Sequence, residues 1–228
     1  MKHIVFDMDG VIVDTEPEYK RRNGMFFKSK GIHISDDVYN LTCGSDLKGS
    51  YEIFRKYVDG FHMTFEEYER EKKAYTQGKP IDVTKCVDPD IYPLLSWLKE
   101  RRFHIALATS SPERSISRYL SALKIEDYFE LKVSGTRFAR SKPDPEIYRY
   151  TMERLKVEPS KCLVVEDSTY GIMAAKAAGA IVIGKKDERF GYDQSGADYL
   201  IKHLTEIVEI ISKVTKVHER NFHEGPFE

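Results

Sequence analysis

Two aspartates, Asp7 and Asp9, follow directly after the apolar run at residues 4–6. Residues at i and i+2 of an extended segment project to the same side, so the two carboxylates share one region. Gly10 comes next and permits a tight exit that a β-branched residue would resist. Carboxylates this close repel each other unless a divalent cation lies between them or one keeps its proton, and both arrangements serve catalysis. A calcium-binding loop is the alternative, but it needs a preceding helix and a glycine where the chain has Ile12.

Two further stretches of the sequence carry polar groups that could contact an anion. Thr109 and Ser110 come after the run at residues 105–108, where a helix is predicted to begin. Hydroxyl and N–H groups at such a point can cradle an anion, although helix capping is the simpler role. Lys142 lies in a short stretch stiffened by two prolines, which suits a fixed positive charge that contacts a carboxylate and a phosphate together.

Glu166 and Asp167 close another apolar run, residues 163–165. Acidic residues at the carboxyl end of a buried parallel strand contribute little to stability. Ligands of open α/β sheets bind at this end of the strands, so a binding role is the better explanation. Asp7, Asp9, Glu166 and Asp167 bring four negative charges against the one positive charge of Lys142. A Mg²⁺ ion, which prefers hard oxygen ligands, balances much of the difference. A phosphate monoester is the ligand that completes this set of charges.

The elements that must position these residues form an alternating pattern of short apolar runs and longer segments with helical spacing. This pattern predicts an α/β fold with a parallel sheet that has helices on both faces. Ser111-Pro112 and Asp144-Pro145 each predict a helix start, with a capping side chain before a proline at the first helical position. The predicted strands are residues 4–6, 105–108, 131–133, 162–165 and 180–183.

Residues 16–82 break this rhythm with helical patterns near 17–31, 46–58 and 64–78. This length exceeds what a crossover between parallel strands needs, so it predicts an inserted helical module. Residues 1–15 and 83–228 would then form the core domain. A helix is predicted near 204–213, followed by a loosely held tail at 216–228.

Composition narrows the function classes. Lys plus Arg number 36 and Asp plus Glu number 37, so the formal charge is −1 and no global basic field is available for nucleic acid. No apolar run approaches the ~18 to 20 residues of a membrane span. Cys43, Cys86 and Cys162 form no close pair, which argues against a disulfide framework and a zinc clip. We therefore expect a cytoplasmic protein, and a monomer because no long apolar stripe is left without a role.

With these motifs in order, the sequence resembles the haloacid dehalogenase (HAD) superfamily, in the branch of β-phosphoglucomutases and phosphatases with a helical cap. The resemblance covers nearly the whole chain and implies a Rossmann-like core with residues 16–82 as the cap domain. The motifs that carry it are residues 6–17, which begin Phe-Asp-Met-Asp-Gly, then Ala108-Thr109-Ser110, Ser141-Lys142-Pro143-Asp144-Pro145 and Glu166-Asp167-Ser168.

The resemblance implies a role for each catalytic position. Asp7 would be the nucleophile that attacks phosphorus and forms an aspartyl phosphate. Asp9 would protonate the leaving alcohol and then deprotonate the hydrolytic water. Thr109 and the N–H of Ser110 would bind the transferring phosphoryl oxygens, and Lys142 would neutralise charge on Asp7 and phosphate.

The resemblance also implies a magnesium site and a class of substrate. Asp7, the Asp9 carbonyl and Asp167 would hold Mg²⁺, and Glu166 would act through water. The substrate would be a small phosphorylated metabolite, a sugar phosphate in our interpretation. A non-catalytic protein on the same fold is the weaker alternative, because the residues that such a protein loses are present.

Two activities compete within the family, hydrolysis and the phosphate exchange of a β-phosphoglucomutase. Tyr19 stands where the mutase pattern has a histidine, and Lys48 lies beside the place of its arginine. Pro112 and Glu113 replace a Lys-Asn pair that grips a second phosphate; proline cannot donate a hydrogen bond and glutamate repels an anion. These departures favour a phosphatase. By family analogy Tyr19, Arg22 and Lys48 are the candidate substrate contacts in the cap.

Overall fold

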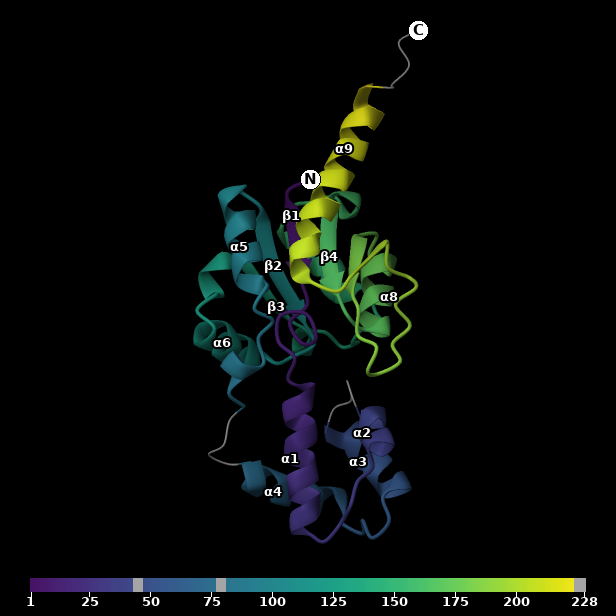
Figure 1. Ribbon diagram of the computed structural model, residues 1–228. Helices are drawn as coiled ribbons and strands as arrows, with labels where there is room; N and C mark the ends of the chain where they lie inside the picture. The colour runs from purple at the N-terminus through teal and green to yellow at the C-terminus, as the bar shows by residue number, and fades with distance from the viewer. Residues whose placement is uncertain (43–46, 77–80, 224–228) are drawn as a thin grey trace. The chain divides into compact units, whose positions relative to one another are not determined.

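A six-stranded parallel sheet forms the framework of the protein. The computed structural model describes residues 1–42, 47–76 and 81–223, with side chains described up to residue 215. The strand order is β3-β2-β1-β4-β5-β6, with every neighbouring pair parallel. The strands (Figure 1) are β1 (His3–Phe6), β2 (His104–Thr109), β3 (Leu131–Ser134), β4 (Cys162–Glu166), β5 (Ile181–Lys185) and β6 (Tyr199–Ile201).

The first five strands confirm the five predicted apolar runs, and the α/β fold class is confirmed with them. Val5 lies in a buried cluster with residues of helices α7 (Glu146–Arg154) and α8 (Thr169–Ala177). Its neighbours Ile4 and Phe6 point to the opposite face and are also fully buried. Both faces of the sheet are therefore covered. The sequence did not predict β6, which has three residues of which only Ile201 is buried.

The predicted helix starts are wrong by one residue. Pro112 and Pro145 occupy the N-cap positions of α6 (Glu113–Ala122) and α7 instead of the first helical positions. Asp144 still caps, since its carboxylate accepts a hydrogen bond from the Glu146 N–H at 3.0 Å. The Ser111 hydroxyl instead donates to the Asp9 carboxylate at 2.7 Å. A long-range acceptor has thus displaced the local capping role of this serine.

Helices α5 (Ile91–Glu100) and α9 (Ile207–His223) both contact the short turn at Leu204–Glu206. The sequence predicted a helix end near residue 213 and a tail from 216, whereas the helix continues to His223. Ile207, Ile210 and Ile211 bury one face of it. Once that face is anchored, each added residue gains a backbone hydrogen bond without further packing, so the helix extends. Residues 224–228 of the predicted tail lie outside the described part of the chain.

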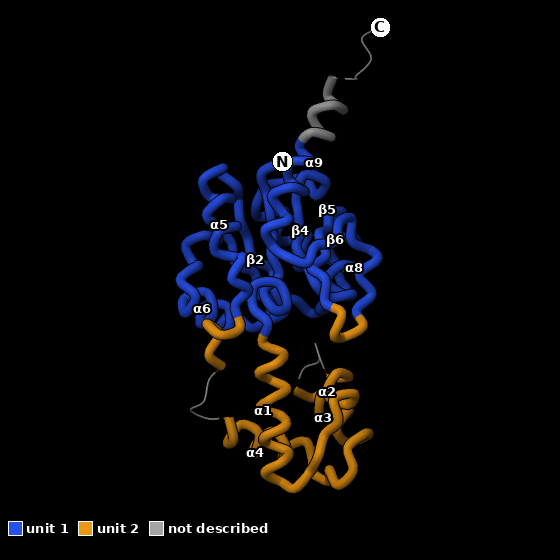
Figure 2. The backbone as a smooth tube through the Cα atoms, in the orientation of Figure 1, with its two compact units in different colours: residues 1–14, 87–187, 192–228 blue, residues 15–86, 188–191 orange. Residues whose placement is uncertain are grey.

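The chain divides into two compact units (Figure 2), the first being residues 1–14, 87–187 and 192–228. The second contains residues 15–86 and 188–191. The predicted boundaries, after residues 15 and 82, lie near these, but the short segment 188–191 was not expected in the second unit. The role of that unit as a cap stays a prediction.

The second unit is helical and has an aromatic core. Its helices are α1 (Glu16–Ser29), α2 (Asp36–Thr42), α3 (Leu47–Tyr57) and α4 (Phe65–Thr76). Three of them confirm the predicted helical segments, while α2 is too short to show a clear helical period. The buried cluster consists of Phe26, Phe27, Tyr51, Phe54, Val58, Phe61 and Tyr68.

Cys162 is buried and Cys86 is half-buried, and no disulfide joins these two residues; Cys43 lies outside the described residues. Within the described ranges, none of the helices combines the length and the apolarity needed to cross a membrane.

Candidate active site

The predicted catalytic and metal-binding residues lie near the carboxyl ends of three neighbouring strands. Phe6 of β1 pairs with Leu107 of β2 on one side and Val165 of β4 on the other. The residues that follow these partners therefore meet at one edge of the sheet, as expected for parallel strands. The Asp7 N–H fixes this register by donating to the Val165 carbonyl at 2.9 Å.

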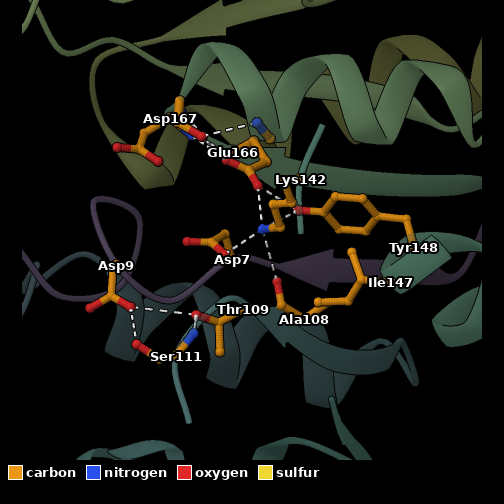
Figure 3. A network of polar contacts seen from close by, with 12 residues as sticks. Asp7, Asp9, Ala108, Thr109, Ser111, Lys142, Ile147, Tyr148, Glu166 and Asp167 are labelled. Atoms are coloured by element: carbon orange, nitrogen blue, oxygen red, sulfur yellow. Dashed lines mark hydrogen bonds and ion pairs between the residues drawn. The ribbon is translucent and has the colours of Figure 1, made fainter. Parts of the chain in front are cut away.

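Lys142 connects two of these strand ends. Its ammonium lies 2.7 Å from Asp7 Oδ1 and 2.6 Å from Glu166 Oε1, and all three side chains are at most 8% exposed. Figure 3 shows the ammonium between Asp7, Glu166 and the Tyr148 hydroxyl, which is 3.0 Å away. The Tyr148 hydroxyl in turn donates to Glu166 at 2.6 Å. Charge-assisted bonds of this kind hold the lysine in one position.

The charges of this cluster do not balance. Burial raises the pKa of Asp7 to about 8, with Lys142 opposing the shift and Glu166 adding to it. Burial also raises the pKa of Asp167 well above its usual value, and the neighbouring Glu166 and Asp7 carboxylates reinforce this. Burial disfavours the charge on Lys142, yet Asp7 and Glu166 hold the pKa of its ammonium well above the ordinary range. One fixed cation thus faces three buried carboxyl groups.

These carboxyl groups fit a divalent cation. Asp7, Glu166 and Asp167 can each offer one oxygen, and these oxygens lie within 4.8 Å of one another. Gly10 has a φ of +78°, and a Cβ at this position would lie 2.0 Å from Asp167 Oδ2. The aspartate turn can approach so closely only because residue 10 has no side chain. Hard oxygen ligands with excess negative charge are what Mg²⁺ requires.

Asp9 belongs to a second group of contacts. Its carboxylate accepts from the Ser111 hydroxyl at 2.7 Å and lies 3.4 Å from the Thr109 hydroxyl (Figure 3). Burial raises the pKa of Asp9, although the bonds from Ser111 and Thr109 oppose the shift. A carboxyl group with a raised pKa keeps its proton to higher pH and can donate it. The two acids after β1 therefore have different partners, an ammonium for Asp7 and two hydroxyls for Asp9, and carboxyl groups in different surroundings can take different chemical roles.

Comparison with known proteins agrees with this arrangement. The haloacid dehalogenase-like hydrolase family matches residues 1–179. A curated relative, the phosphorylated carbohydrates phosphatase of Thermotoga maritima, is 32% identical and covers 94% of this chain and all of its own length. The chain belongs to the haloacid dehalogenase-like hydrolase family.

Other relatives of this HAD hydrolase include the β-phosphoglucomutase of Bacillus subtilis, 28% identical over 91% of the chain and 92% of the relative. A crystal structure from Thermotoga maritima, described as a candidate β-phosphoglucomutase, superposes with a TM-score of 0.73. It is 30% identical and covers 94% of this chain and 100% of its own. The predicted superfamily branch, fold class and enzyme class, a phosphoric monoester hydrolase, are confirmed.

The structure places the predicted site residues of the HAD hydrolase in different surroundings. Asp7, Lys142, Glu166 and Asp167 form one cluster, and Asp9 with Thr109 forms the other. Ser110, after β2, is exposed. Tyr19 and Lys48 are exposed residues of the second unit. The substrate-binding roles of Ser110, Tyr19 and Lys48 stay predictions. Residues 44–46 of the predicted loop at 44–48 lie outside the described part of the chain.

Sequence reasoning missed Tyr148, the buried partner of both Lys142 and Glu166. Within a helix, an aromatic residue two positions after Glu146 is indistinguishable from an ordinary core residue. The structure also shows what requires Gly171 in the first turn of α8, since a Cβ there would lie 2.0 Å from the Glu166 carboxyl carbon. Helix α8 can thus approach Glu166 only where it has a glycine.

Proposed function

We propose that this HAD hydrolase is a magnesium-dependent phosphatase that hydrolyses a sugar phosphate through an aspartyl phosphate at Asp7. The observation that supports this most strongly is the bonding of Lys142 to both Asp7 and Glu166 beside Asp167. This arrangement holds the Asp7 carboxylate at the carboxyl-terminal edge of the sheet, and the three carboxyl groups leave an excess of negative charge that a cation can balance. A phosphate monoester is the ligand that such a lysine and cation attract together.

Asp7 and Asp9 divide the chemistry between them. A carboxylate oxygen of Asp7 attacks phosphorus, the bond from phosphorus to the ester oxygen breaks, and the proton of Asp9 passes to the leaving alkoxide. Water then attacks the phosphorus of the aspartyl phosphate, one proton of the water passes to the Asp9 carboxylate, the bond from phosphorus to the Asp7 oxygen breaks, and inorganic phosphate leaves. Thr109 and the Ser110 N–H hold the non-bridging oxygens, and Lys142 offsets charge on the phosphoryl group.

Asp7 and Asp167 would hold the Mg²⁺ ion, together with the Asp9 carbonyl, and Glu166 would contribute through water. The ion supplies positive charge that keeps Asp7 ionised and neutralises the phosphoryl group. This contribution matters because, even with Lys142 beside it, burial and the neighbouring carboxylates raise the pKa of Asp7 to about 8.

The choice of a sugar phosphate rests on relatives and on departures from the mutase pattern. The Thermotoga maritima relative is named for phosphorylated carbohydrates, and hexitol phosphatase B of Escherichia coli is 27% identical over 89% of the chain. Pro112 and Glu113 stand where a mutase grips its second phosphate. We therefore favour transfer to water over transfer to a sugar.

Phosphate release from a panel of hexose and hexitol phosphates tests this proposal. With Mg²⁺ we expect turnover of at least one member, with a loss of about 100-fold or more in EDTA and recovery when Mg²⁺ is restored, since the ion neutralises several charges at once. Unchanged turnover in EDTA would contradict the metal assignment.

The mutase alternative has its own assay. The protein is given β-glucose 1-phosphate with a glucose bisphosphate primer, and both glucose 6-phosphate and free phosphate are measured. Accumulation of glucose 6-phosphate without free phosphate would overturn the proposed hydrolysis.

A further inference from the structure

Lys185 is a half-buried lysine at the end of β5, with a side chain that is 14% exposed. Its ammonium lies 3.2 Å from the Gly10 carbonyl, 3.1 Å from the Val11 carbonyl and 2.7 Å from Asp88 Oδ2. An ammonium has three N–H donors, and these three acceptors satisfy all of them. The family motifs in the sequence do not include this residue.

The two carbonyls that Lys185 contacts belong to the tight turn directly after Asp9. Within this turn the Gly10 N–H donates to Val13 at 2.8 Å and the Ile12 N–H donates to Met8 at 2.9 Å. The Asp88 N–H also donates to the Ile12 carbonyl at 2.9 Å. The hydrogen bonds within the turn do not use the carbonyls of Gly10, Val11 and Ile12. Lys185 and the Asp88 N–H bind these carbonyls and so hold the turn from outside.

Gln194 connects the end of β5 to the turn that carries Asp167. Gln194 is buried, and its side-chain amide donates to the Asp167 carbonyl and, at 2.7 Å, to the Lys185 carbonyl. Its oxygen accepts from the Asp187 N–H at 3.3 Å. Gly10 lies against the Asp167 carboxylate, so the two acid-bearing turns are in contact. The end of β5 is thus bonded to both turns.

We propose that Lys185, supported by Gln194, is a positioning residue that fixes the turn carrying Asp9 against the turn carrying Asp167. The part of this inference that concerns turnover rests on the proposed phosphatase function. Lys185 does not contact the Asp9 carboxyl group; it acts through the backbone of the next two residues. A displacement of about 1 Å in such a turn can cost about 100-fold in rate.

The first test does not depend on activity. Hydrogen–deuterium exchange is measured over residues 8–13 in the wild type, Lys185→Met and Lys186→Met. Lys186 is the matched control, since it is the next residue and its side chain is exposed. We expect exchange in this segment to be at least about threefold faster in Lys185→Met and unchanged in Lys186→Met, because exchange follows local opening. Equal exchange in all three proteins would overturn the proposal.

The second test uses two leaving groups. p-Nitrophenolate leaves without a proton, whereas a sugar alkoxide needs the proton of Asp9. Lys185→Met should lower kcat/KM at least about tenfold for the sugar phosphate that the wild type hydrolyses best, and less than about threefold for p-nitrophenyl phosphate, since a misplaced general acid costs most where the leaving group needs a proton. An equal fall for both esters would overturn the positioning role.

Loss of stability is separated from loss of positioning by the double variant Lys185→Met with Asp88→Asn. The single variant leaves the Asp88 carboxylate without its cation, and the double variant removes that charge. We expect the melting temperature to recover in the double variant while the selective loss of activity on the sugar phosphate remains. Recovery of activity together with stability would overturn the proposal. A wild type without phosphatase activity would refute the proposed function, whereas the exchange experiment decides the positioning role in either case.

Discussion

Asp7→Asn should lower kcat for the best phosphomonoester by at least about ten-thousand-fold, the scale seen when one member of a concerted catalytic unit is removed. The amide has nearly the shape of the carboxylate, but its oxygen is a poor nucleophile at phosphorus. The substitution also removes one of the three buried carboxyl groups around Lys142. The metal-free variant should therefore melt at or above the wild-type temperature.

Phosphate release and thermal unfolding are measured on the same preparations. Asp127→Asn is the matched control, because Asp127 is exposed and lies outside both site clusters. Its turnover should equal that of the wild type. Residual turnover above about 1% in Asp7→Asn would contradict the nucleophile assignment, since an amide cannot supply that rate.

Lys142→Met should reduce both activity and stability. Without the ammonium, Asp7 and Glu166 face each other as buried carboxylates, and breaking a buried ion pair in this way costs about 3–5 kcal/mol. We also expect kcat to fall at least about 100-fold, the loss typical when one fixed group that stabilises transition-state charge is removed. No other single lysine should have so large an effect on both properties.

The pH dependence of Lys142→Met follows from the pKa of the remaining acids. In the folded wild type the pKa of Asp7 is already raised from 3.8 to about 8, and loss of Lys142 raises it further. A carboxyl group with a raised folded-state pKa costs stability when it must ionise, and the cost disappears as it takes up a proton. Between pH 4 and 7 Asp7 is protonated in both folded proteins, so the stability deficit of the variant should stay level there, and it should widen as the pH rises from 7 to 10, where only the wild type accommodates the Asp7 charge beside an ammonium.

Thermal unfolding over this pH range, without added metal, is the measurement. Lys213→Met, on an exposed position of α9, is the matched control and should follow the wild type at every pH. A deficit that stays constant with pH would show that Lys142 contributes packing and not charge.

The sequence predicted the sheet because its central strands are continuous apolar runs. Such runs arise only where both faces of a strand are buried, and Ile4, Val5 and Phe6 meet this condition. The position of the site followed from the same fact, since parallel strands end at one edge. Asp7, Lys142 and Glu166 could be brought together from sequence without any knowledge of side-chain geometry.

The supporting residues could not be predicted in this way. Ser111 has a local role available as a helix cap, and only the fold offers it Asp9 as a partner. Tyr148 and Gln194 are buried polar groups whose partners are distant in sequence. The contacts of Lys185 depend on where β5 ends relative to the turn after Asp9. Such partners depend on three-dimensional placement, which local spacing does not encode.

Chemical trapping at Asp7 tests the central claim most directly. The protein is mixed with Mg²⁺ and a hydrolysed hexose phosphate, quenched during turnover and treated with borohydride, which reduces an acyl phosphate to an alcohol. The proposed mechanism predicts homoserine at position 7 by peptide mass spectrometry, dependent on substrate and absent from Asp7→Asn. Turnover without this product at position 7, or with reduction at another carboxylate, would contradict it.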